Sequence, residues 1–347
     1  MTKIDIFSGF LGAGKTTLIK KLIKEAYTGE RVVLIENEFG EIGIDGGFLQ
    51  DAGIEITEMN SGCICCTLVG DFTKALEKVL AEYAPDRIII EPSGVGKLSD
   101  IIKAVGKVND PEAVLNCFTT VADAGKCKMY AKNFGEFYND QISHASAIFL
   151  SHTDKASDKK VAEAVALLRE LNESAVIITT PADKLDGKDI LAAMERKDTL
   201  EDALAKLEEE AHHHHHHHEH DEHCECGCHD HEHHNHEHDE HCECGCHDHD
   251  HHHHHADEVF TSVGVETTRK FTASEIESVL ERFDEDGELG MILRAKGIVE
   301  GENGTWIHFD YVPGEADVRV GSASVIGRLC VIGSGIEKEK IKALFGV

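Results

Sequence analysis

The sequence lacks the features expected of a protein that works at a membrane or on nucleic acid. Residues 208–258 contain 17 Asp and Glu but no Lys or Arg, and the 347-residue chain has a formal net charge of −31. An acidic surplus of this size disfavours nucleic acid and anionic membranes as partners. No apolar run approaches the roughly 18 residues of a membrane-spanning helix. Residues 1–10 also lack the layout of a signal peptide, so we expect a cytoplasmic location.

The twelve cysteines are therefore expected to lie in a reducing compartment. Clustered cysteines in such a compartment indicate metal or redox chemistry more often than disulfides. Cys117, Cys127 and Cys330 stand alone in predicted strands or helices, and we expect them to be small core residues. The other cysteines are clustered, and these clusters are the candidates for metal binding.

The largest cluster lies in residues 212–255, which hold 23 of the 26 histidines and six cysteines. The stretch HDEHCECGCHDH occurs at residues 220–231 and again at 238–249. An affinity tag is disfavoured because the tract is internal, whereas an inert solvated spacer remains open because the tract has no hydrophobic pattern. Its composition favours a flexible metal-binding segment. The candidate ligands are His223, Cys224, Cys226, Cys228, His229, His241, Cys242, Cys244, Cys246 and His247.

Residues 1–200 alternate short apolar runs with segments whose apolar residues recur at helical spacing. Near-continuous apolar strands separated by helices indicate an α/β domain, with a mainly parallel sheet covered by helices on both faces. Its strands are expected at residues 4–7, 31–37, 54–59, 87–92, 114–121, 147–151 and 175–180.

Two further parts follow this domain. Residues 201–257 are expected to form an acidic, His- and Cys-rich, disordered linker, which includes most of an acidic helix over 199–210. Residues 258–347 carry strand patterns and two helices, at 272–283 and 336–345. They predict a small C-terminal α+β domain, so the linker joins two folded units.

The strongest motif is GFLGAGKT at residues 9–16, which fits the pattern GxxxxGK[ST]. It follows a predicted strand and opens a predicted helix, as a phosphate loop requires. Backbone N–H groups of such a loop surround phosphate oxygens, the Lys reaches the β- and γ-phosphates, and the Thr hydroxyl holds Mg²⁺. The sequence therefore predicts a nucleotide site formed by Gly9, Gly12, Ala13, Gly14, Lys15, Thr16 and Thr17.

RIIIEPSGVG at residues 87–96 supplies a second element of this site. Glu91 ends a buried strand and is a candidate to position Mg²⁺ or the attacking water. Gly94 would let its backbone approach the γ-phosphate. The alternative for Glu91 is a structural role as the cap of the next helix.

Between these elements lie ENEFGEIGID at 36–45 and NSGCICC at 60–66. The thiolates of Cys63, Cys65 and Cys66 suit Zn²⁺ or a similar metal, and buried apolar cysteines are the alternative. These loops occupy the position of segments that respond to the γ-phosphate in nucleotide switches. Acidic residues that would complete a tetrahedral site are Glu36, Glu38 and Glu41.

Together GFLGAGKTT, ENEFGE, GCICC and EPSG resemble the CobW-type metallochaperone GTPases, which are relatives of the urease and hydrogenase nickel-insertion GTPases. LRAKGIVE, TWIHF and LCVIG resemble the C-terminal domain of that family, so the resemblance covers nearly the whole chain. It implies GTP hydrolysis coupled to delivery of Zn²⁺, Co²⁺ or Ni²⁺ to a client metalloprotein or a metal-cofactor assembly protein. It also implies that the cysteines of GCICC match the metal motif of the family, and Lys15 and Thr16 its phosphate and Mg²⁺ positions. A second copy of the chain is a further candidate partner.

One stretch departs from the family pattern. Family members usually carry an Asn-Lys-x-Asp motif that recognises the base, whereas this chain has Ser151-His152-Thr153-Asp154. Asp154 keeps a carboxylate that would accept the two guanine donors. His152 would stack on the purine in place of a Lys stem, and an ordinary loop histidine is the alternative. Ser151 is a poorer substitute for Asn. A guanine preference is therefore expected, although weaker than is usual for the family.

Two other functions remain open at this point. A metal buffer would use the His- and Cys-rich tract as its functional part, with nucleotide as a regulator. A P-loop phosphotransferase would act on a small molecule and would give GCICC no role beside a switch. Metal-stimulated GTP turnover distinguishes the metallochaperone from both.

Overall fold

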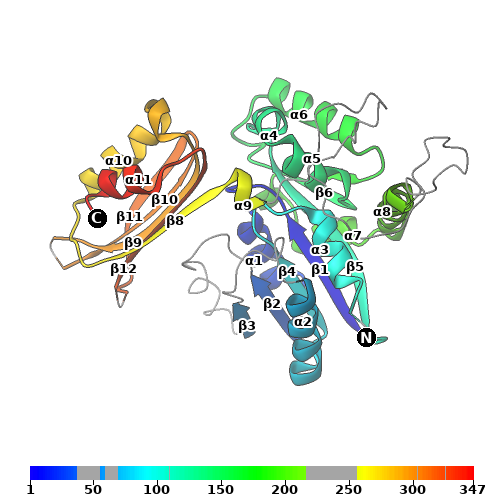
Figure 1. Cartoon of the computed structure of the whole chain (residues 1–347). Coiled ribbons are helices and arrows are strands. Elements are labelled where there is room, and N and C mark those ends of the chain that lie inside the picture. Colours follow the sequence, from blue (N-terminus) through cyan, green and yellow to red (C-terminus); the bar gives the residue numbers. More distant parts are fainter. Residues whose placement is uncertain (37–54, 59–68, 109, 216–255, 303, 325) are drawn as a thin grey trace, which may run out of the picture.

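The computed structural model describes residues 1–36, 55–58, 69–108, 110–215, 256–302, 304–324 and 326–347. These residues form two sheets with separate sets of helices, the first before and the second after the His- and Cys-rich tract (Figure 1). No helix among them is long and apolar enough to cross a membrane.

The first sheet has seven strands among the described residues, in the order β3-β2-β4-β1-β5-β6-β7, and all neighbouring strands run parallel. The prediction of a parallel sheet is therefore confirmed, and each expected strand has a counterpart. The strands are β1 (Thr2–Ser8), β2 (Val32–Glu36), β3 (Glu55–Glu58), β4 (Arg87–Glu91), β5 (Ala113–Asp123), β6 (Ala147–Ser151) and β7 (Val176–Ile178).

Helices cover both faces of this sheet, as the apolar strands require. The core on one face includes residues of α1 and α7, and the core on the other face includes residues of α2 to α6 and α8. Ile4 and Ile6 of β1 pack into the second core, whereas Phe7 packs into the first. The helices are α1 (Lys15–Glu25), α2 (Val69–Tyr83), α3 (Leu98–Val105), α4 (Cys127–Asn133), α5 (Gly135–Ser143), α6 (Asp158–Leu171), α7 (Gly187–Met194) and α8 (Lys197–His215), with a short 3-10 helix η3 (Ala182–Lys184).

The second sheet has five antiparallel strands among the described residues, in the order β11-β10-β9-β12-β8. Helices α10 and α11 pack on one of its faces, where Leu280 and Ile341 join a core with Leu329 of β12. Thr272 and Glu275 form a reciprocal capping box that fixes the start of α10. The elements are α9 (Ala256–Val259), β8 (Thr261–Thr267), α10 (Ala273–Glu285), η5 (Gly287–Leu289), β9 (Met291–Glu300), β10 (Trp306–Val312), β11 (Glu315–Gly321), β12 (Gly327–Ser334) and α11 (Lys338–Phe345).

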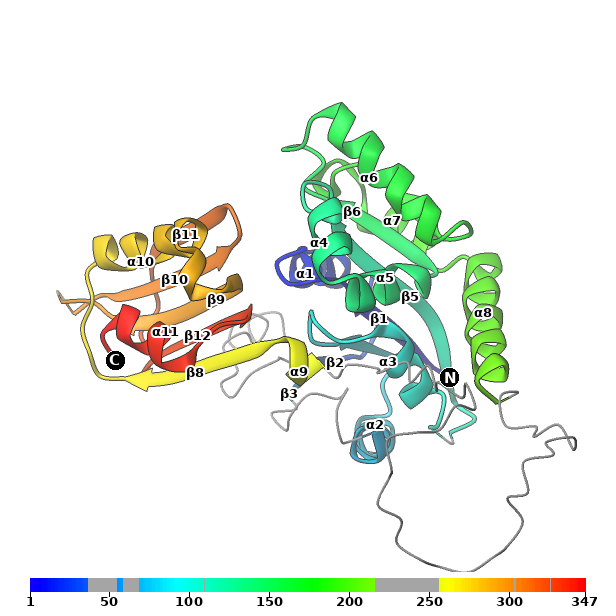
Figure 2. The ribbon, with the colours of Figure 1, turned by 45° about the horizontal axis from the view of Figure 1, so that its top comes forward.

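The short helix α9 and strand β8 connect the two units in space (Figures 1 and 2). Between them lies Phe260, which is 2% exposed. Its ring centroid lies 5.3 Å from that of Phe134, 5.2 Å from that of Phe137 and 6.1 Å from that of Phe10. Phe10 belongs to the predicted phosphate loop, so the start of the second sheet is packed behind that loop.

Two elements differ from the sequence-based expectation. The sequence patterns do not predict β11, because it is a largely exposed edge strand with few apolar residues. Pro313-Gly314 between β10 and β11 was the available signal, since such a pair marks a tight turn. Helix α8 runs to residue 215, and Ala203 is buried in the first unit. The chain therefore stays packed on this unit beyond residue 200, where the linker was expected to begin.

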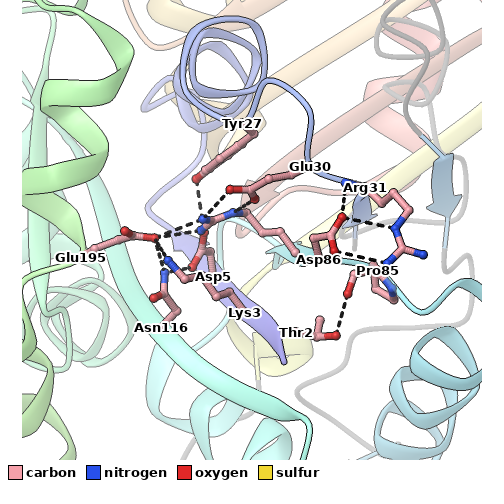
Figure 3. A network of polar contacts seen from close by, with 11 residues as sticks. Thr2, Lys3, Asp5, Tyr27, Glu30, Arg31, Pro85, Asp86, Asn116 and Glu195 are labelled. Atoms are coloured by element: carbon pink, nitrogen blue, oxygen red, sulfur yellow. Dashed lines mark hydrogen bonds and ion pairs between the residues drawn. The ribbon is translucent and has the colours of Figure 1, made fainter.

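A polar network lies on the α1 and α7 side of the first sheet (Figure 3). Arg87 of β4 and Asp5 of β1 form an ion pair that is almost completely buried, with side chains 1% and 0% exposed. Two further carboxylates reach the same guanidinium, Glu30 at 2.6 Å and Glu195 at 3.1 Å. The guanidinium also lies over the ring of Tyr27, 4.3 Å from its centroid.

The network joins segments that are distant in the sequence. Asn116 of β5 donates to Asp5 at 2.7 Å and to Glu195 at 2.8 Å, and Lys3 pairs with Glu195 at 2.9 Å. The chain after α1, the residue after α7 and three adjacent strands therefore meet around Arg87. A buried ion pair is stable only when its remaining hydrogen-bonding capacity is satisfied, and these contacts satisfy it.

Replacing Arg87 with Met should destabilise the protein by about 3–5 kcal/mol, because the buried Asp5 carboxylate loses its counter-charge. The matched control is Arg31→Met. Arg31 pairs with Asp86 at the exposed surface, so its loss should cost under about 1 kcal/mol. Urea unfolding followed by circular dichroism measures both free energies. Equal losses in the two variants would contradict a stabilising role for the buried network.

Candidate functional site

The loop between β1 and α1 has the backbone of an anion-binding turn. Gly9, Gly12 and Gly14 have φ angles of 136°, 71° and 96°, a region that residues with a side chain rarely adopt. A Cβ on Gly9 would lie 2.3 Å from the carbonyl oxygen of Val121, so β5 also leaves no room there. Gly14 is the N-cap of α1 and offers no side chain to its first N–H groups. These N–H groups and the helix dipole favour an anion such as phosphate.

Lys15 begins α1 and is 5% exposed. Its ammonium donates to the carbonyl oxygen of Gly9 at 2.8 Å and to that of Phe10 at 3.4 Å. The carbonyls thus hold the charged group over the same loop whose N–H groups favour an anion. This position fits the predicted role of Lys15 toward phosphate.

Thr16 and Glu91 meet beside the loop. The Thr16 hydroxyl lies 3.1 Å and 3.3 Å from the two carboxylate oxygens of Glu91, which ends β4. Glu36 ends the neighbouring strand β2, pairs in register with Glu91 and is 7% exposed. Hydroxyl and carboxylate oxygens are the ligands that Mg²⁺ prefers, so the residues fit this ion. The helix-cap alternative for Glu91 is not supported, because Lys97 is the N-cap of the next helix, α3.

Gly94 lies against the phosphate loop. A Cβ at this position would be 2.8 Å from Cδ2 of Leu11 and 2.9 Å from its backbone nitrogen. The Gly94 carbonyl accepts a hydrogen bond from Gln141 at 3.1 Å. Gly94 therefore permits close packing of the segment after β4 on the loop, and its approach to a phosphate stays a prediction.

The predicted base-recognition stretch begins at the end of β6. The Ser151 hydroxyl donates to the carbonyl oxygen of Ala13 at 2.7 Å, and so ties this stretch to the phosphate loop. His152 has a φ of 55°, and its Nδ1 lies 3.0 Å from Oδ2 of Asp123. Asp154 is exposed. The contact of Asp154 with a base and the stacking of His152 on it stay predictions.

Asp123 ends β5, and sequence reasoning missed it. Its hydrogen bond raises the pKa of His152 above the ordinary value of 6.5, although partial burial opposes the rise. Burial acts to raise the pKa of Asp123, but the bonds from His152 and from the N–H of Gly125 outweigh it and leave the pKa below the ordinary 3.8. Both shifts favour a charged pair. The signal in the sequence was a polar residue at the carboxyl end of an apolar strand, where α/β proteins bind ligands.

A cavity of about 570 Å³ lies beside the phosphate loop, and residues of both units line it. Lys20 and Lys155 line it although sequence reasoning did not identify them. The predicted nucleotide residues that line it are Gly12, Gly14, Lys15, Thr16, Thr17, Glu91 and His152, whereas Gly9, Ala13, Gly94, Ser151 and Asp154 do not. The other lining residues come from the second sheet and were not predicted: Arg294, Lys296, Asp310, Tyr311, Val312, Glu315, Ala316, Asp317 and Arg319.

The predicted transition-metal ligands, with the exception of Glu36, lie outside the described residues. This applies to Glu38, Glu41, the three cysteines of GCICC and the ligands of the His- and Cys-rich tract. Within the ranges that the structure describes, no group of three or more His, Cys, Asp or Glu side chains is placed to hold a metal ion. The three isolated cysteines are buried, as expected of core residues.

The fold and this site define a P-loop nucleotide-binding protein. The chain belongs to the CobW/HypB/UreG family, because the nucleotide-binding domain of that family matches residues 3–179. The C-terminal domain of the cobalamin synthesis protein CobW matches residues 260–347. The resemblance seen in the sequence motifs is confirmed by both matches.

Curated relatives carry names that refer to zinc. Zinc chaperone YeiR of Escherichia coli K12 is 32% identical over 158 residues, which cover 45% of this chain and 48% of the relative. Zinc chaperone CobW of Sinorhizobium sp is 34% identical over 178 residues, 43% of this chain and 50% of the relative. Zinc-regulated GTPase metalloprotein activator 1 of Schizosaccharomyces pombe is 30% identical over 199 residues, 53% of this chain and 46% of the relative. The chain thus spans about half the length of the curated relatives it matches.

Among solved structures, the Zn(II)-bound YjiA GTPase of E. coli aligns over 99% of this chain and 98% of its own, with 20% identity and a TM-score of 0.43. HypB of Helicobacter pylori in complex with nickel aligns over 60% of this chain and 87% of its own, with 17% identity and a TM-score of 0.39. The family assignment rests on the sequence matches.

Replacing Asp123 with Asn should lower stability by about 1–2 kcal/mol between roughly pH 4 and 6.5, and much less at about pH 9. Because the pKa of His152 is raised in the folded protein, protonated His152 stabilises the fold fully below the ordinary His pKa. This stabilisation is lost as the pH rises through the raised pKa. Because the pKa of Asp123 is lowered in the folded protein, ionised Asp123 stabilises the fold above the ordinary Asp pKa. This stabilisation is lost as the pH falls through the lowered pKa. Thermal unfolding of both proteins across pH measures the difference. A difference that stays constant into the alkaline range would refute the charged pair.

Proposed function

We propose that this protein is a GTP-hydrolysing metallochaperone, which binds a transition metal and delivers it to a client protein or cofactor pathway in a nucleotide-dependent way. The observation that carries the proposal is the arrangement at the left-handed glycine turn, where Lys15 is held over the loop and the Thr16 hydroxyl lies 3.1 Å from Glu91. Family membership supports nucleotide binding, and the names of the relatives support zinc as the metal.

The residues of the site would act on the nucleotide in three ways. The N–H groups of the loop and the ammonium of Lys15 bind the β- and γ-phosphates and offset charge as the γ-phosphoryl group transfers. Thr16 and Glu91 would hold Mg²⁺, which when bound draws charge from the same phosphates. Glu91 is also a candidate to orient the attacking water. Because these groups are held before the nucleotide arrives, little rearrangement is needed.

Base selection would fall to the stretch after β6. Asp154 has the carboxylate that accepts two guanine donors, and Ser151 fixes the stretch against Ala13. The ion pair with Asp123 orients the His152 ring, which lines the cavity. The carboxylate of Asp154 is the feature that favours GTP over ATP as the substrate in this proposal.

The metal would be cargo. The three cysteines of GCICC, with Glu36 or one of the acidic residues after it, form the proposed transfer site, whose thiolates favour Zn²⁺, with Co²⁺ and Ni²⁺ as alternatives. Residues 212–255 would act as a tethered reservoir that raises the local metal concentration near this site. Glu36 ends the strand beside Glu91, so the proposed metal segment starts next to the phosphate site.

Replacing Lys15 with Ala should lower GTP turnover by about two or more orders of magnitude, since the cation that stabilises the transferring phosphoryl group is lost. Lys24→Ala is the matched control, because Lys24 is exposed near the end of the same helix. Phosphate release is measured with and without Zn²⁺, Co²⁺ and Ni²⁺. Parental turnover in Lys15→Ala would refute the phosphate-loop assignment, and turnover that is indifferent to all three metals would refute the metallochaperone.

A further inference from the structure

The cavity beside the phosphate loop has a second wall that is formed by the C-terminal sheet. Lys15 and Thr16 line the cavity from the first unit, whereas Arg294, Lys296 and Asp310 line it from β9 and β10, far along the chain. Its volume of about 570 Å³ lies within the range of roughly 300–1,000 Å³ that is typical of small-molecule sites. A nucleotide on the phosphate loop would therefore face both units.

The second wall is the face of the C-terminal sheet that α10 and α11 leave uncovered. Successive side chains of a strand point to opposite faces. Ala295 and Tyr311 belong to the core beneath the helices and are 0% and 2% exposed. Arg294 and Lys296 flank Ala295 in β9, so both side chains project from the other face. Asp310 precedes Tyr311 and pairs in register with Lys296, so it shares that face.

Contacts with both ends of the wall hold it against the first unit. A Cβ on Gly12 would lie 2.3 Å from Cγ1 of Val312, so the end of β10 touches the loop backbone directly. Lys155, which follows the predicted base stretch, forms an ion pair with Glu315 at the start of β11. Phe260, packed among the aromatic rings behind the loop, precedes the first strand of the sheet. The C-terminal sheet therefore contacts the phosphate loop and the segment that follows the predicted base-recognition stretch.

The cavity carries a cationic surplus in a strongly acidic chain. Of the described residues, six Lys and Arg line it against four Asp and Glu, whereas the whole chain carries −31. A partly enclosed site with surplus positive charge concentrates anions. Each acidic side chain of the cavity contacts another lining residue. Glu91 accepts a hydrogen bond from Thr16, and the ion pairs are Glu315 with Lys155, Asp310 with Arg319 and Asp317 with Arg319.

Lys296 is a largely buried cation on the side of the cavity that the C-terminal sheet forms. Its side chain is 14% exposed, and its ammonium lies 3.9 Å from Oδ1 of Asp310. Arg319 donates to the other oxygen of Asp310 at 3.0 Å. The shared carboxylate thus orients two cations from β9 and β11, and shielding from water strengthens their interaction with an anion in the cavity.

We propose that the C-terminal sheet is part of the nucleotide site, and that Lys296, with Arg294 beside it, binds the phosphate groups of the nucleoside triphosphate held by the phosphate loop. This inference rests on the proposed nucleotide function and adds to it a contribution from the second unit. It gives the C-terminal domain a role in binding, because all the contacts to the nucleotide form only when the sheet lies against the loop.

The test measures the affinity of the full-length protein for a fluorescent, non-hydrolysable GTP analogue with Mg²⁺ and for guanosine. Lys296→Met should weaken binding of the triphosphate about tenfold or more, since a charge-assisted contact is lost. Guanosine affinity should change less than about twofold, because guanosine has no phosphate to contact the lost charge. Lys296→Arg should restore most of the triphosphate affinity, and Arg294→Met should weaken the triphosphate selectively as well.

Arg328→Met is the matched control. Arg328 lies on β12, pairs with Glu266 and does not line the cavity, so its loss should leave triphosphate affinity within about twofold of the parent. Urea unfolding of every variant checks that the fold is retained. Parental affinity in Lys296→Met and Arg294→Met, together with lost affinity in Lys15→Ala, would overturn the second wall and leave the proposed function intact. A parent protein that binds no nucleotide would instead overturn both.

Discussion

The site depends on one backbone constraint, which is the left-handed turn that follows β1. Glycine adopts the φ angles of Gly9, Gly12 and Gly14 without strain, and at Gly9 it also leaves room for the backbone of β5. The turn places Lys15 and Thr16 in the first turn of α1. Because the strands are parallel, β2, β4, β5 and β6 end at the same edge of the sheet and bring their last polar residues around this turn.

Much of the fold could be predicted because its strands are buried. An apolar run such as RIIIE at Arg87–Glu91 has few alternatives to a covered parallel strand, and the observed strands of the first sheet start and end within two residues of the expected positions. Strand β11 could not be predicted in the same way, because its pairing with β10 fixes it and its own composition does not. The helix over 199–210 was expected, but its packing on the first unit through Ala203 was not, because that packing is a long-range contact.

In the site too, local sequence predicts some residues, whereas others depend on long-range contacts. Lys15, Thr16 and Glu91 were predictable because the phosphate loop and the strand end are local motifs with a fixed backbone requirement. The position of Asp123 at a strand end had a signal in the sequence, but its pairing with His152 did not, since it depends on which strands become neighbours. The place of Lys296 beside the cavity depends on where the C-terminal sheet lies. A sequence pattern carries no direct information on such juxtapositions. The predicted cysteine site lies outside the described residues and stays a prediction.

Nucleotide-dependent metal binding is tested most directly in a variant that lacks residues 212–255, because that His- and Cys-rich tract would itself bind Zn²⁺. Its Zn²⁺ affinity is measured in the presence of a non-hydrolysable GTP analogue and in the presence of GDP. If the γ-phosphate arranges the segment that follows Glu36, the two affinities should differ by about 5–150-fold, as is typical of allosteric coupling. The difference should disappear when Cys63, Cys65 and Cys66 are replaced by Ser. Equal Zn²⁺ affinities of this variant in the two nucleotide states would contradict the coupling.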